Sequence, residues 1–332
     1  MNQLQIDLTG SPASVPGFSV GHAQLQDVPC GLSVVLCPQG AVGGVAVAGS
    51  AAGTRQMDGL RPGHVVERVH GLLFTGGSSF GLAAAGGVQR FLEEQGAGLE
   101  AGPVRIPIVP AAVIFDLALT RGRGRPGPEL GLAACRAAGT DPMPRGSVGC
   151  GAGATVGKLF GLEQACRGGL GGAALRVGGL RMGAMVVVNC FGDVLDERGR
   201  IMAGARRSAE SLELVDTAGY FLQGGRRRAF SSVSNTTLAV VTTNARMDKA
   251  AACKVAELAH HGMVRAIRPV HTMFDGDLVC LLSRGEVDAD LNGLGMMAAL
   301  LVRLAIYDAV RSATALAGLP TAAELVPLEP LY

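Results

Sequence analysis

Residues 231–244 constrain the fold of this chain more than any other segment, because hydroxyl residues lead directly into a β-branched apolar run. The segment reads Ser-Ser-Val-Ser-Asn-Thr-Thr-Leu-Ala-Val-Val-Thr-Thr-Asn. Such alternation of Val, Leu and Thr is typical of a strand, and Asn235 and Thr236 stand where this strand would begin. A Thr at a strand start is commonly just a good strand residue. It becomes a nucleophile if the bond before it is cut, because the new α-amine then acts as its general base.

The composition indicates a folded, glycine-rich chain whose net positive charge is too small to attract nucleic acid. Hydrophobic residues make up 48% of the 332 residues and charged residues 17%, which indicates a globular protein. Gly contributes 50 residues, about twice the usual share, in clusters that lack a Gly-X-Y period. The net charge of +2 offers no electrostatic basis for a nucleic-acid partner.

The N-terminal residues and the Cys and His positions favour a cytoplasmic protein without a membrane partner, a metal or another cofactor. The first seven residues show neither the basic nor the apolar region of a signal peptide. The longest apolar stretch, near 294–305, contains Arg303 and is short for a membrane span. The eight Cys include no Cys-x-x-Cys pair, and the six His show no metal-ligand spacing with acids or Cys.

Expected strands and helices alternate, which places the chain in the α+β class with α/β-type layers. The expected strands are 34–36, 45–48, 106–114, 184–189, 237–242 and 278–283. The expected helices are 62–73, 82–95, 129–139, 247–261 and 294–317. Residues 203–235 are polar and Arg-rich with little period, so we expect an exposed linker that ends at Asn235 and Thr236.

Two glycine-rich segments suggest other chemistry. Gly77-Ser-Ser79-Phe-Gly81 fits the nucleophile elbow of α/β-hydrolases, with Asp116 or Asp193 and His271 as possible partners of Ser79. A Gly loop that feeds a helix is the favoured interpretation. The segment 149–158 resembles a phosphate-binding loop but lacks the required Gly and Ser/Thr, so what remains is a turn that presents Lys158.

Asp275-Gly-Asp277 places two carboxylates on one side of an extended segment, because side chains alternate along a strand. An Asp-rich turn would show the same letters. A carboxylate pair of this kind can also hold an ammonium group or share a proton.

Taken together, nine segments resemble the family of L-aminopeptidase/D-amino-acid amidases, β-peptidyl aminopeptidases and nylon-oligomer endo-hydrolases. They lie in the family's order and run over nearly the whole chain. The matching segments are 20–22, 40–45, 53–55, 76–82, 109–116, 149–161, 186–193, 235–244 and 271–277.

This resemblance implies a four-layer αββα sandwich made by a precursor that cuts itself into two associated chains. The cut would fall between Asn235 and Thr236. Residues 1–235 would then form the α chain and 236–332 the β chain of a single domain. The resemblance also implies a homo-oligomer of these cleaved heterodimers.

The resemblance further implies a role for each candidate residue. Thr236 is the nucleophile and its amine the base, and Asn189 is the oxyanion donor. Lys158 matches a lysine of the nylon-oligomer branch, where it would lower the pKa of the Thr236 amine. The acidic pair, Asp275 and Asp277, would position that amine.

Departures from the family pattern bear on the substrate. The β-aminopeptidase branch carries Ser-x-Glu where this chain has Asp275-Gly-Asp277. A Glu and a Tyr that line the aminopeptidase pocket fall on Val113 and Phe115, which we place in the substrate pocket with Ser79. We therefore expect an N-terminal threonine amidohydrolase for small peptides or oligoamides and leave aminopeptidase specificity open. Three alternatives remain: a Ser79 esterase of the α/β-hydrolase type, an acyltransferase of the ornithine-acetyltransferase type, and an uncut, non-catalytic scaffold.

Overall fold

A ten-stranded sheet forms the centre of the computed structural model, which describes residues 3–140, 142–226, 235–316 and 318–326. The strands run in the order β1-β11-β12-β17-β19-β3-β5-β8-β4, and β2 pairs with β3. Neighbours are antiparallel except for β17 with β19 and β5 with β8. The strands are β1 (Gln5–Asp7), β2 (Ser19–Gln24), β3 (Gly31–Val47), β4 (Thr54–Arg55), β5 (Arg68–Thr75), β8 (Ala111–Val113), β11 (Gly169–Val177), β12 (Leu180–Asn189), β17 (Thr236–Ala245) and β19 (Leu278–Val287).

The long strand β3 joins two halves of this sheet. Its first half pairs with β2 and β5 and its second half pairs with β19, and the pairing with β5 shifts register between Leu36 and Ala41. Apolar side chains from both halves meet in one buried cluster that includes Val35, Leu72 and Val240. The two halves therefore pack face to face around a shared core.

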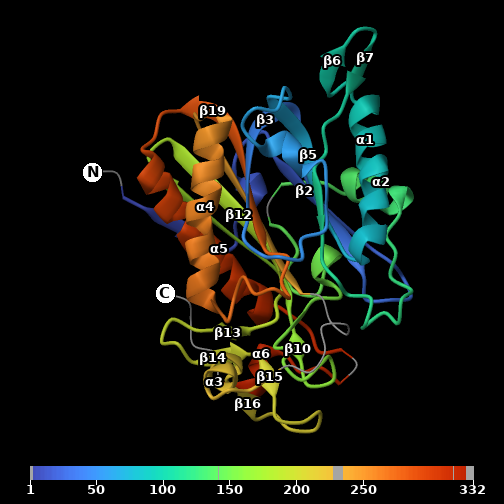
Figure 1. The fold of residues 1–332 in the computed structure, drawn as a ribbon. Coiled ribbons are helices and arrows are strands. Elements are labelled where there is room, and N and C mark those ends of the chain that lie inside the picture. Colours follow the sequence, from blue (N-terminus) through green and yellow to red (C-terminus); the bar gives the residue numbers. More distant parts are fainter. Residues whose placement is uncertain (1–2, 141, 227–234, 317, 327–332) are drawn as a thin grey trace.

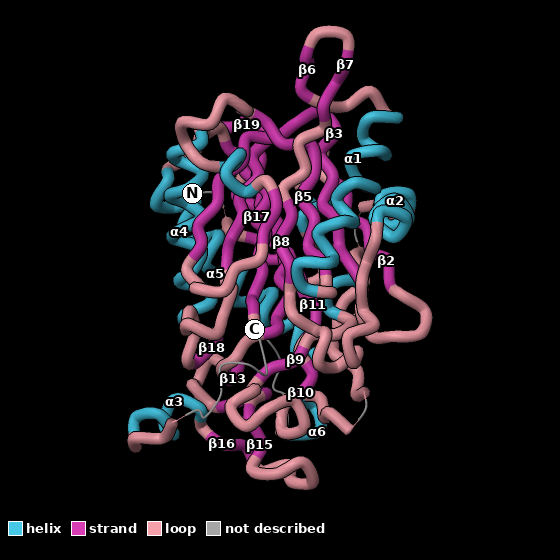
Figure 2. Tube along the Cα trace, turned by 45° about the vertical axis from the view of Figure 1, so that its right-hand side comes forward, coloured by secondary structure: helices cyan, strands magenta, loops and turns pink. Residues whose placement is uncertain are grey.

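Helices cover the outer face of each half (Figures 1 and 2). The pair α4 (Lys249–Ala266) and α5 (Leu291–Arg311) packs on the half that contains β11, β12 and β17. The pair α1 (Ala85–Glu94) and α2 (Pro128–Arg136) packs on the opposite half. Val186 and Ala239 face α4 and α5, whereas their neighbours Val187 and Leu238 face the shared core, as the period of a strand requires. The layers run helix, sheet, sheet, helix, and the expected mixed α/β class is confirmed.

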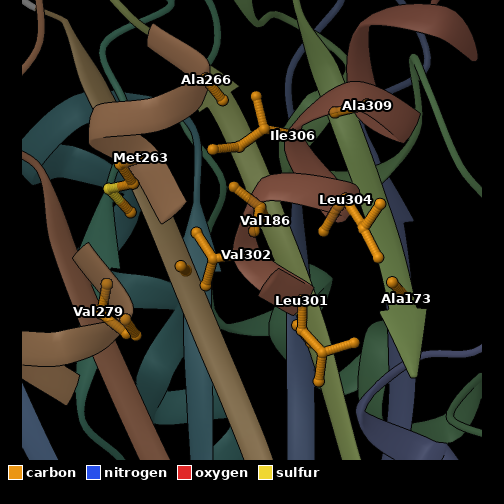
Figure 3. Packing of buried hydrophobic residues seen from close by; sticks show 14 of the residues in the cluster. Ala173, Val186, Met263, Ala266, Val279, Leu301, Val302, Leu304, Ile306 and Ala309 are labelled. Atoms are coloured by element: carbon orange, nitrogen blue, oxygen red, sulfur yellow. The ribbon is translucent and has the colours of Figure 1, made fainter. Parts of the chain in front are cut away.

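The apolar helix α5 lies in the core beneath β11 and β12. Length and composition alone would allow it to cross a membrane, and 67% of its most apolar window is buried. Leu301, Val302 and Leu304 pack among side chains of α4 and the sheet (Figure 3). In the described part of the chain α5 is thus the core helix of the larger helix pair.

A smaller region adjoins the end of the sheet where β12 ends and β17 begins (Figure 1). The expected exposed linker 203–235 is wrong for 203–222, which contains two short strands, a helix and the buried residues Ala205 and Arg206. The guanidinium of Arg206 donates to main-chain oxygens of Glu163 at 2.6 Å and Ser211 at 3.2 Å. A segment that folds irregularly around one buried cation has no hydrophobic period in its sequence. For this reason the sequence predicts a linker here. Residues 227–234 lie outside the described residues.

The short elements complete the fold. They are β6 (Leu99–Ala101), β7 (Val104–Ile106), β9 (Thr155–Val156), β10 (Cys166–Arg167), β13 (Asp193–Leu195), β14 (Ile201–Ala203), β15 (Ala205–Arg206), β16 (Leu214–Val215), β18 (Ile267–Arg268), α3 (Thr217–Leu222), α6 (Ala322–Leu325) and 3₁₀ turns at Pro12–Ser14, Met57–Leu60, Ser78–Ala84 and Gly149–Gly151.

Three further expectations need correction. The expected helix 62–73 is wrong, because 68–75 forms strand β5, which is buried on both faces and so shows a continuous apolar run. The expected strand 106–114 shrinks to Ala111–Val113, since the prolines at 107 and 110 cannot donate to a ladder. The two strands expected at 34–36 and 45–48 are parts of β3. The other expected strands and helices are present with shifted ends.

Candidate active site

Thr236 is the first residue of β17, a strand in the middle of the sheet with all ten residues buried. It pairs in register with Asn189, the last residue of β12. The Thr236 hydroxyl donates to the main-chain oxygen of Asn235. The hydroxyl therefore lies against the carbonyl of the bond at which the sequence predicts a cut.

The side-chain amide of Asn189 is held in one orientation. Its Oδ1 accepts from the Lys158 ammonium at 2.8 Å and from Thr155 N at 3.0 Å. The Nδ2 group donates to Phe115 O at 3.4 Å, which is long for a hydrogen bond. Because the cation binds the oxygen, the amide N–H groups point the other way and are only weakly engaged.

The glycine-rich turn before Lys158 allows the chain to approach the end of β12 closely. Gly157 has φ of +71°, and a Cβ there would lie 2.0 Å from the carbonyl carbon of Gly204. Gly157 N donates to Gly192 O and Lys158 N to Phe191 O, both at 3.1 Å. This turn buries the Lys158 side chain, whose Nζ also donates to Asn189 O at 3.0 Å.

Asp277 anchors the start of the nucleophile strand. Its Oδ1 accepts from Thr237 N at 2.6 Å. Its Oδ2 accepts from His271 N at 3.1 Å and lies 2.9 Å from His271 Nδ1. This fully buried carboxylate ties the segment before β19 to β17, and its partners are main-chain and imidazole groups.

Asp275 anchors the other side of the same segment. Its Oδ1 accepts from Phe191 N at 3.0 Å, and its Oδ2 accepts from the Thr272 hydroxyl. Burial, and then the charge of Asp277, raise the pKa of Asp275 to about 7, while Lys158 and the hydrogen bonds oppose this rise. The resemblance implies that both carboxylates position the Thr236 amine. In the structure, their oxygens accept hydrogen bonds from the surrounding segments.

The sequence reasoning missed Gly276, which stands between the two carboxylates. Gly276 N donates to Asn235 O at 2.8 Å, and Asn235 N donates to Phe274 O at 3.1 Å. A Cβ on Gly276 would lie 2.9 Å from Thr236 Oγ1. The available signal was the glycine itself, since a Gly between two functional residues often marks a close backbone approach.

An aromatic cluster beside the site was also missed. The Phe191 ring packs at a tilt against Phe274, with ring centroids 5.1 Å apart, and against Phe221 at 6.1 Å. Tyr220 contacts Phe221 at 5.8 Å and Phe160 at 5.6 Å. Two of these rings come from α3, in the segment taken for a linker, so their position depends on contacts that no local pattern reveals.

The expected pocket residues are only partly brought together. Val113 is buried on β8, and Phe115 meets Asn189 through its main-chain oxygen. Ser79 is exposed in the 3₁₀ turn Ser78–Ala84. The described contacts pair His271 with Asp277, so the structure does not assemble a Ser79 triad around that imidazole.

The two Asp residues considered as triad partners are also engaged elsewhere. Asp116 accepts from Gly77 N at 2.7 Å, and burial raises its pKa. Asp193 accepts from Ala205 N and from the Thr217 hydroxyl, and burial raises its pKa to about 6. Within the described ranges, no group of three or more His, Cys, Asp or Glu side chains could hold a metal ion.

Comparisons with known proteins identify a peptidase family and several relatives. The sequence pattern of Peptidase family S58 matches residues 13–323. A protein of Mycobacterium tuberculosis described as an uncharacterized aminopeptidase is 36% identical, over 96% of this chain and 98% of its own length. The 6-aminohexanoate-oligomer endohydrolase of Kocuria sp. is 32% identical, over 82% of this chain and 74% of its own length.

Two solved structures share the fold. The β-aminopeptidase of Burkholderia sp. superposes with a TM-score of 0.69 over 99% of this chain and 98% of its own, at 18% identity. The L-aminopeptidase D-Ala-esterase/amidase of Ochrobactrum anthropi, described as a variant of the Ntn hydrolase fold, gives 0.68 over 92% and 88%, at 16% identity. At these identities the likeness concerns the fold alone.

Proposed function

The chain belongs to peptidase family S58, and we propose that it is a self-processing amidohydrolase whose nucleophile is Thr236. The family and its relatives establish the coarser class of peptidase or amidohydrolase. One observation carries the finer proposal: the Thr236 hydroxyl lies on the carbonyl of Asn235, at the start of a buried central strand. The placement of Asn189 opposite Thr236 supports it further.

Self-cleavage begins with attack of Thr236 Oγ1 on the carbonyl carbon of Asn235. A bond from Oγ1 to this carbon forms, the bond from the carbon to the Thr236 nitrogen breaks, and the hydroxyl proton goes to that nitrogen. The product is an ester on Thr236 with a free α-amine. Water then hydrolyses the ester, which leaves a carboxylate on Asn235 and restores the hydroxyl.

Hydrolysis of a substrate uses the same hydroxyl with the new amine as its base. The α-amine accepts the hydroxyl proton as Oγ1 attacks the substrate carbonyl, and it passes the proton to the leaving amine. The acyl group then rests on Thr236 as an ester until water removes it. Neither step needs a metal or an organic cofactor to balance its protons and electrons.

Asn189 and Lys158 act on the charge that develops during both steps. The N–H of the fixed Asn189 amide is only weakly engaged and is available to the oxyanion, and one such donor contributes about 3 kcal/mol of transition-state stabilisation. Lys158 holds the Asn189 oxygen and keeps the amide from flipping. Its positive charge also favours the neutral, proton-accepting form of the nearby amine.

We propose amide bonds of small peptides or oligoamides as the substrate class. Among the relatives, one is described as an aminopeptidase and one acts on 6-aminohexanoate oligomers. Val113 and Phe115 add no acid that would pair with a free substrate amine. The pocket chemistry therefore favours recognition of the amide group over recognition of a charged N-terminus.

Intact mass and N-terminal sequencing of the purified protein test this proposal. The wild-type chain should appear as two fragments, the second beginning at Thr236, and should hydrolyse small amides. Thr236→Val keeps the shape of the side chain without its hydroxyl and should stay uncut and inactive, whereas Thr236→Ser should still cut. Thr237→Val is the matched control, because its main-chain bond to Asp277 remains and only the neighbouring hydroxyl is lost. An uncut wild-type chain, or a cut Thr236→Val chain, would refute the proposal.

A further inference from the structure

We propose that His271 is a positioning residue that keeps Thr236 in place, through Asp277, once the chain has been cut. The inference rests on the proposed function of Thr236. It gives a task to an imidazole that neither self-cleavage nor hydrolysis uses directly. Two contacts connect this imidazole to the nucleophile: the His271 ring meets the Asp277 carboxylate, and that carboxylate accepts from the main chain of Thr237.

His271 binds one oxygen of Asp277 with two donors. Its main-chain N–H donates to Oδ2 at 3.1 Å, and its ring Nδ1 lies 2.9 Å from the same oxygen. An ionised carboxylate only accepts hydrogen bonds, so Nδ1 carries the proton and donates. Asp277 is fully buried, and within the described ranges His271 is the one basic side chain at ion-pair distance from it. The position of this carboxylate therefore depends on His271 more than on any other side chain.

The His271 ring is held in place although its backbone conformation is unfavourable. The φ of His271 is +55°, in the left-handed region that residues other than Gly seldom adopt. His260 of α4 packs edge to face on the His271 ring with centroids 4.7 Å apart, and its Nε2 lies 3.1 Å from Ala46 O. Burial lowers the pKa of His260, so the neighbouring ring is neutral. A costly backbone conformation that the surroundings maintain is frequent at functional sites.

Self-cleavage removes one of the two chain connections of Thr236. In the uncut chain, Asn235 fixes the nucleophile from one side through two main-chain hydrogen bonds of its own. The cut breaks the bond between these two residues. Besides the pairing of β17 with β12, what then holds the new chain end is the N–H of Thr237, which donates to Asp277 at 2.6 Å. His271 should therefore matter more for hydrolysis of a substrate than for the first cut.

Two substitutions of His271 separate its hydrogen bond from its ring. His271→Asn places an amide N–H near the position of Nδ1–H, and Asn tolerates the left-handed backbone. His271→Gly accepts the same backbone without strain and removes the donor. The rates of hydrolysis are normalised to the amount of cut chain, measured by intact mass, so that a loss of folded protein does not appear as a loss of kcat.

We expect His271→Gly to lower kcat for a small amide by about 10- to 100-fold with little change in KM, because a nucleophile displaced by about 1 Å reacts that much more slowly. Its self-cleavage should slow only a few-fold. His271→Asn should bring kcat back to within a few-fold of the wild type. His261→Asn, at an exposed position of α4, is the control for the loss of an imidazole elsewhere and should match the wild type. If the Gly variant does not fold, His271→Leu, which fills the space of the ring without a donor, takes its place.

The outcomes separate this inference from the proposed function. An unchanged kcat in the variant without the donor would overturn the inference alone. A His271→Asn enzyme as slow as that variant would do the same, because the hydrogen bond would then not be what matters. Equal slowing of self-cleavage and hydrolysis, or a change in KM alone, would show a general structural role and overturn it as well. A wild-type chain that stays uncut would overturn the proposed function and this inference with it.

Discussion

The ammonium of Lys158 lies 2.8 Å from Oδ1 of Asn189 and 3.0 Å from the main-chain oxygen of the same residue. One buried cation therefore fixes both the side chain and the backbone at the end of β12. Because Asn189 pairs with Thr236, this contact controls what faces the proposed nucleophile.

Lys158→Met keeps the length of the side chain but removes its charge. We expect self-cleavage and hydrolysis to fall by about 10- to 100-fold, since a loosened Asn189 amide is a poorer donor than a fixed one. Lys249→Met is the matched control, because Lys249 is also buried and donates to Gly59 O and His64 O, away from the site. Rates from quantitative mass spectrometry would contradict the prediction if both variants lost activity equally.

Asn189→Asp replaces the amide donor by a carboxylate of the same shape. We expect kcat to fall by about 100- to 1000-fold with a smaller change in KM, because the lost bond forms mainly in the transition state. Asn244→Asp is the control at the far end of the same strand pair, where the Asn244 oxygen accepts from Arg181 N at 2.8 Å. Steady-state kinetics that left kcat of Asn189→Asp unchanged would remove Asn189 from the mechanism.

Gly276→Ala places a methyl group 2.9 Å from Thr236 Oγ1. We expect a folded protein that cuts itself at least about 100-fold more slowly, since displacement of the nucleophile by even a fraction of an ångström is costly. Gly86→Ala, in helix α1, meets no atom within 4 Å and should cut normally. Circular dichroism would establish folding of both variants, and normal cleavage of Gly276→Ala would show that this space is not needed.

Asp275→Asn should change how stability depends on pH. The pKa of Asp275 is raised in the folded protein to about 7 from its ordinary value of 3.8, so between these values the folded state binds more protons than the unfolded state. Its contribution to stability is present at low pH and is lost as pH rises through about 7. The variant keeps an acceptor for Phe191 N, and its free energy of unfolding should no longer fall between these pH values. Urea unfolding at pH 5 and pH 8 measures the free energy of unfolding of both proteins. An equal fall between the two pH values in the wild type and the variant would contradict the expectation.

Ser79→Ala tests the alternative nucleophile. Ser79 is exposed, and His271 is bound to Asp277, so we expect self-cleavage and hydrolysis within about two-fold of the wild type, as for most surface substitutions. A loss of amide or ester hydrolysis with intact self-cleavage would favour the esterase alternative. Assays on one amide and one ester substrate distinguish the two.

Much of the core could be predicted from local pattern. The buried strand that begins at Thr236 was predicted because β-branched residues follow hydroxyl residues without a break. The helices α4 and α5 lie where helices were expected, at 247–261 and 294–317, in the alternation of strands and helices. The family was also predicted, since its segments recur in order along the chain, and the match to peptidase family S58 confirms it.

Other parts could not be predicted, because their order comes from distant contacts. Strand β5 packs on both faces, so it lacks the alternation that marks a half-buried strand. The region around Arg206 is organised by main-chain oxygens from several segments around one guanidinium. No window of neighbouring residues contains that information.

Some features of the candidate site could likewise be predicted from the sequence, and others depend on the fold. Thr236, Lys158, Asp275 and Asp277 were singled out by residue type and setting, whereas Asn189 and the roles of all five were implied by the resemblance to the family. The partners of the two carboxylates and the position of Gly276 N on the Asn235 carbonyl came from the fold alone. The reaction that a side chain can perform follows from its residue type and can be predicted from the sequence. The direction of a main-chain donor depends on two segments that the fold brings together by parallel strand pairing.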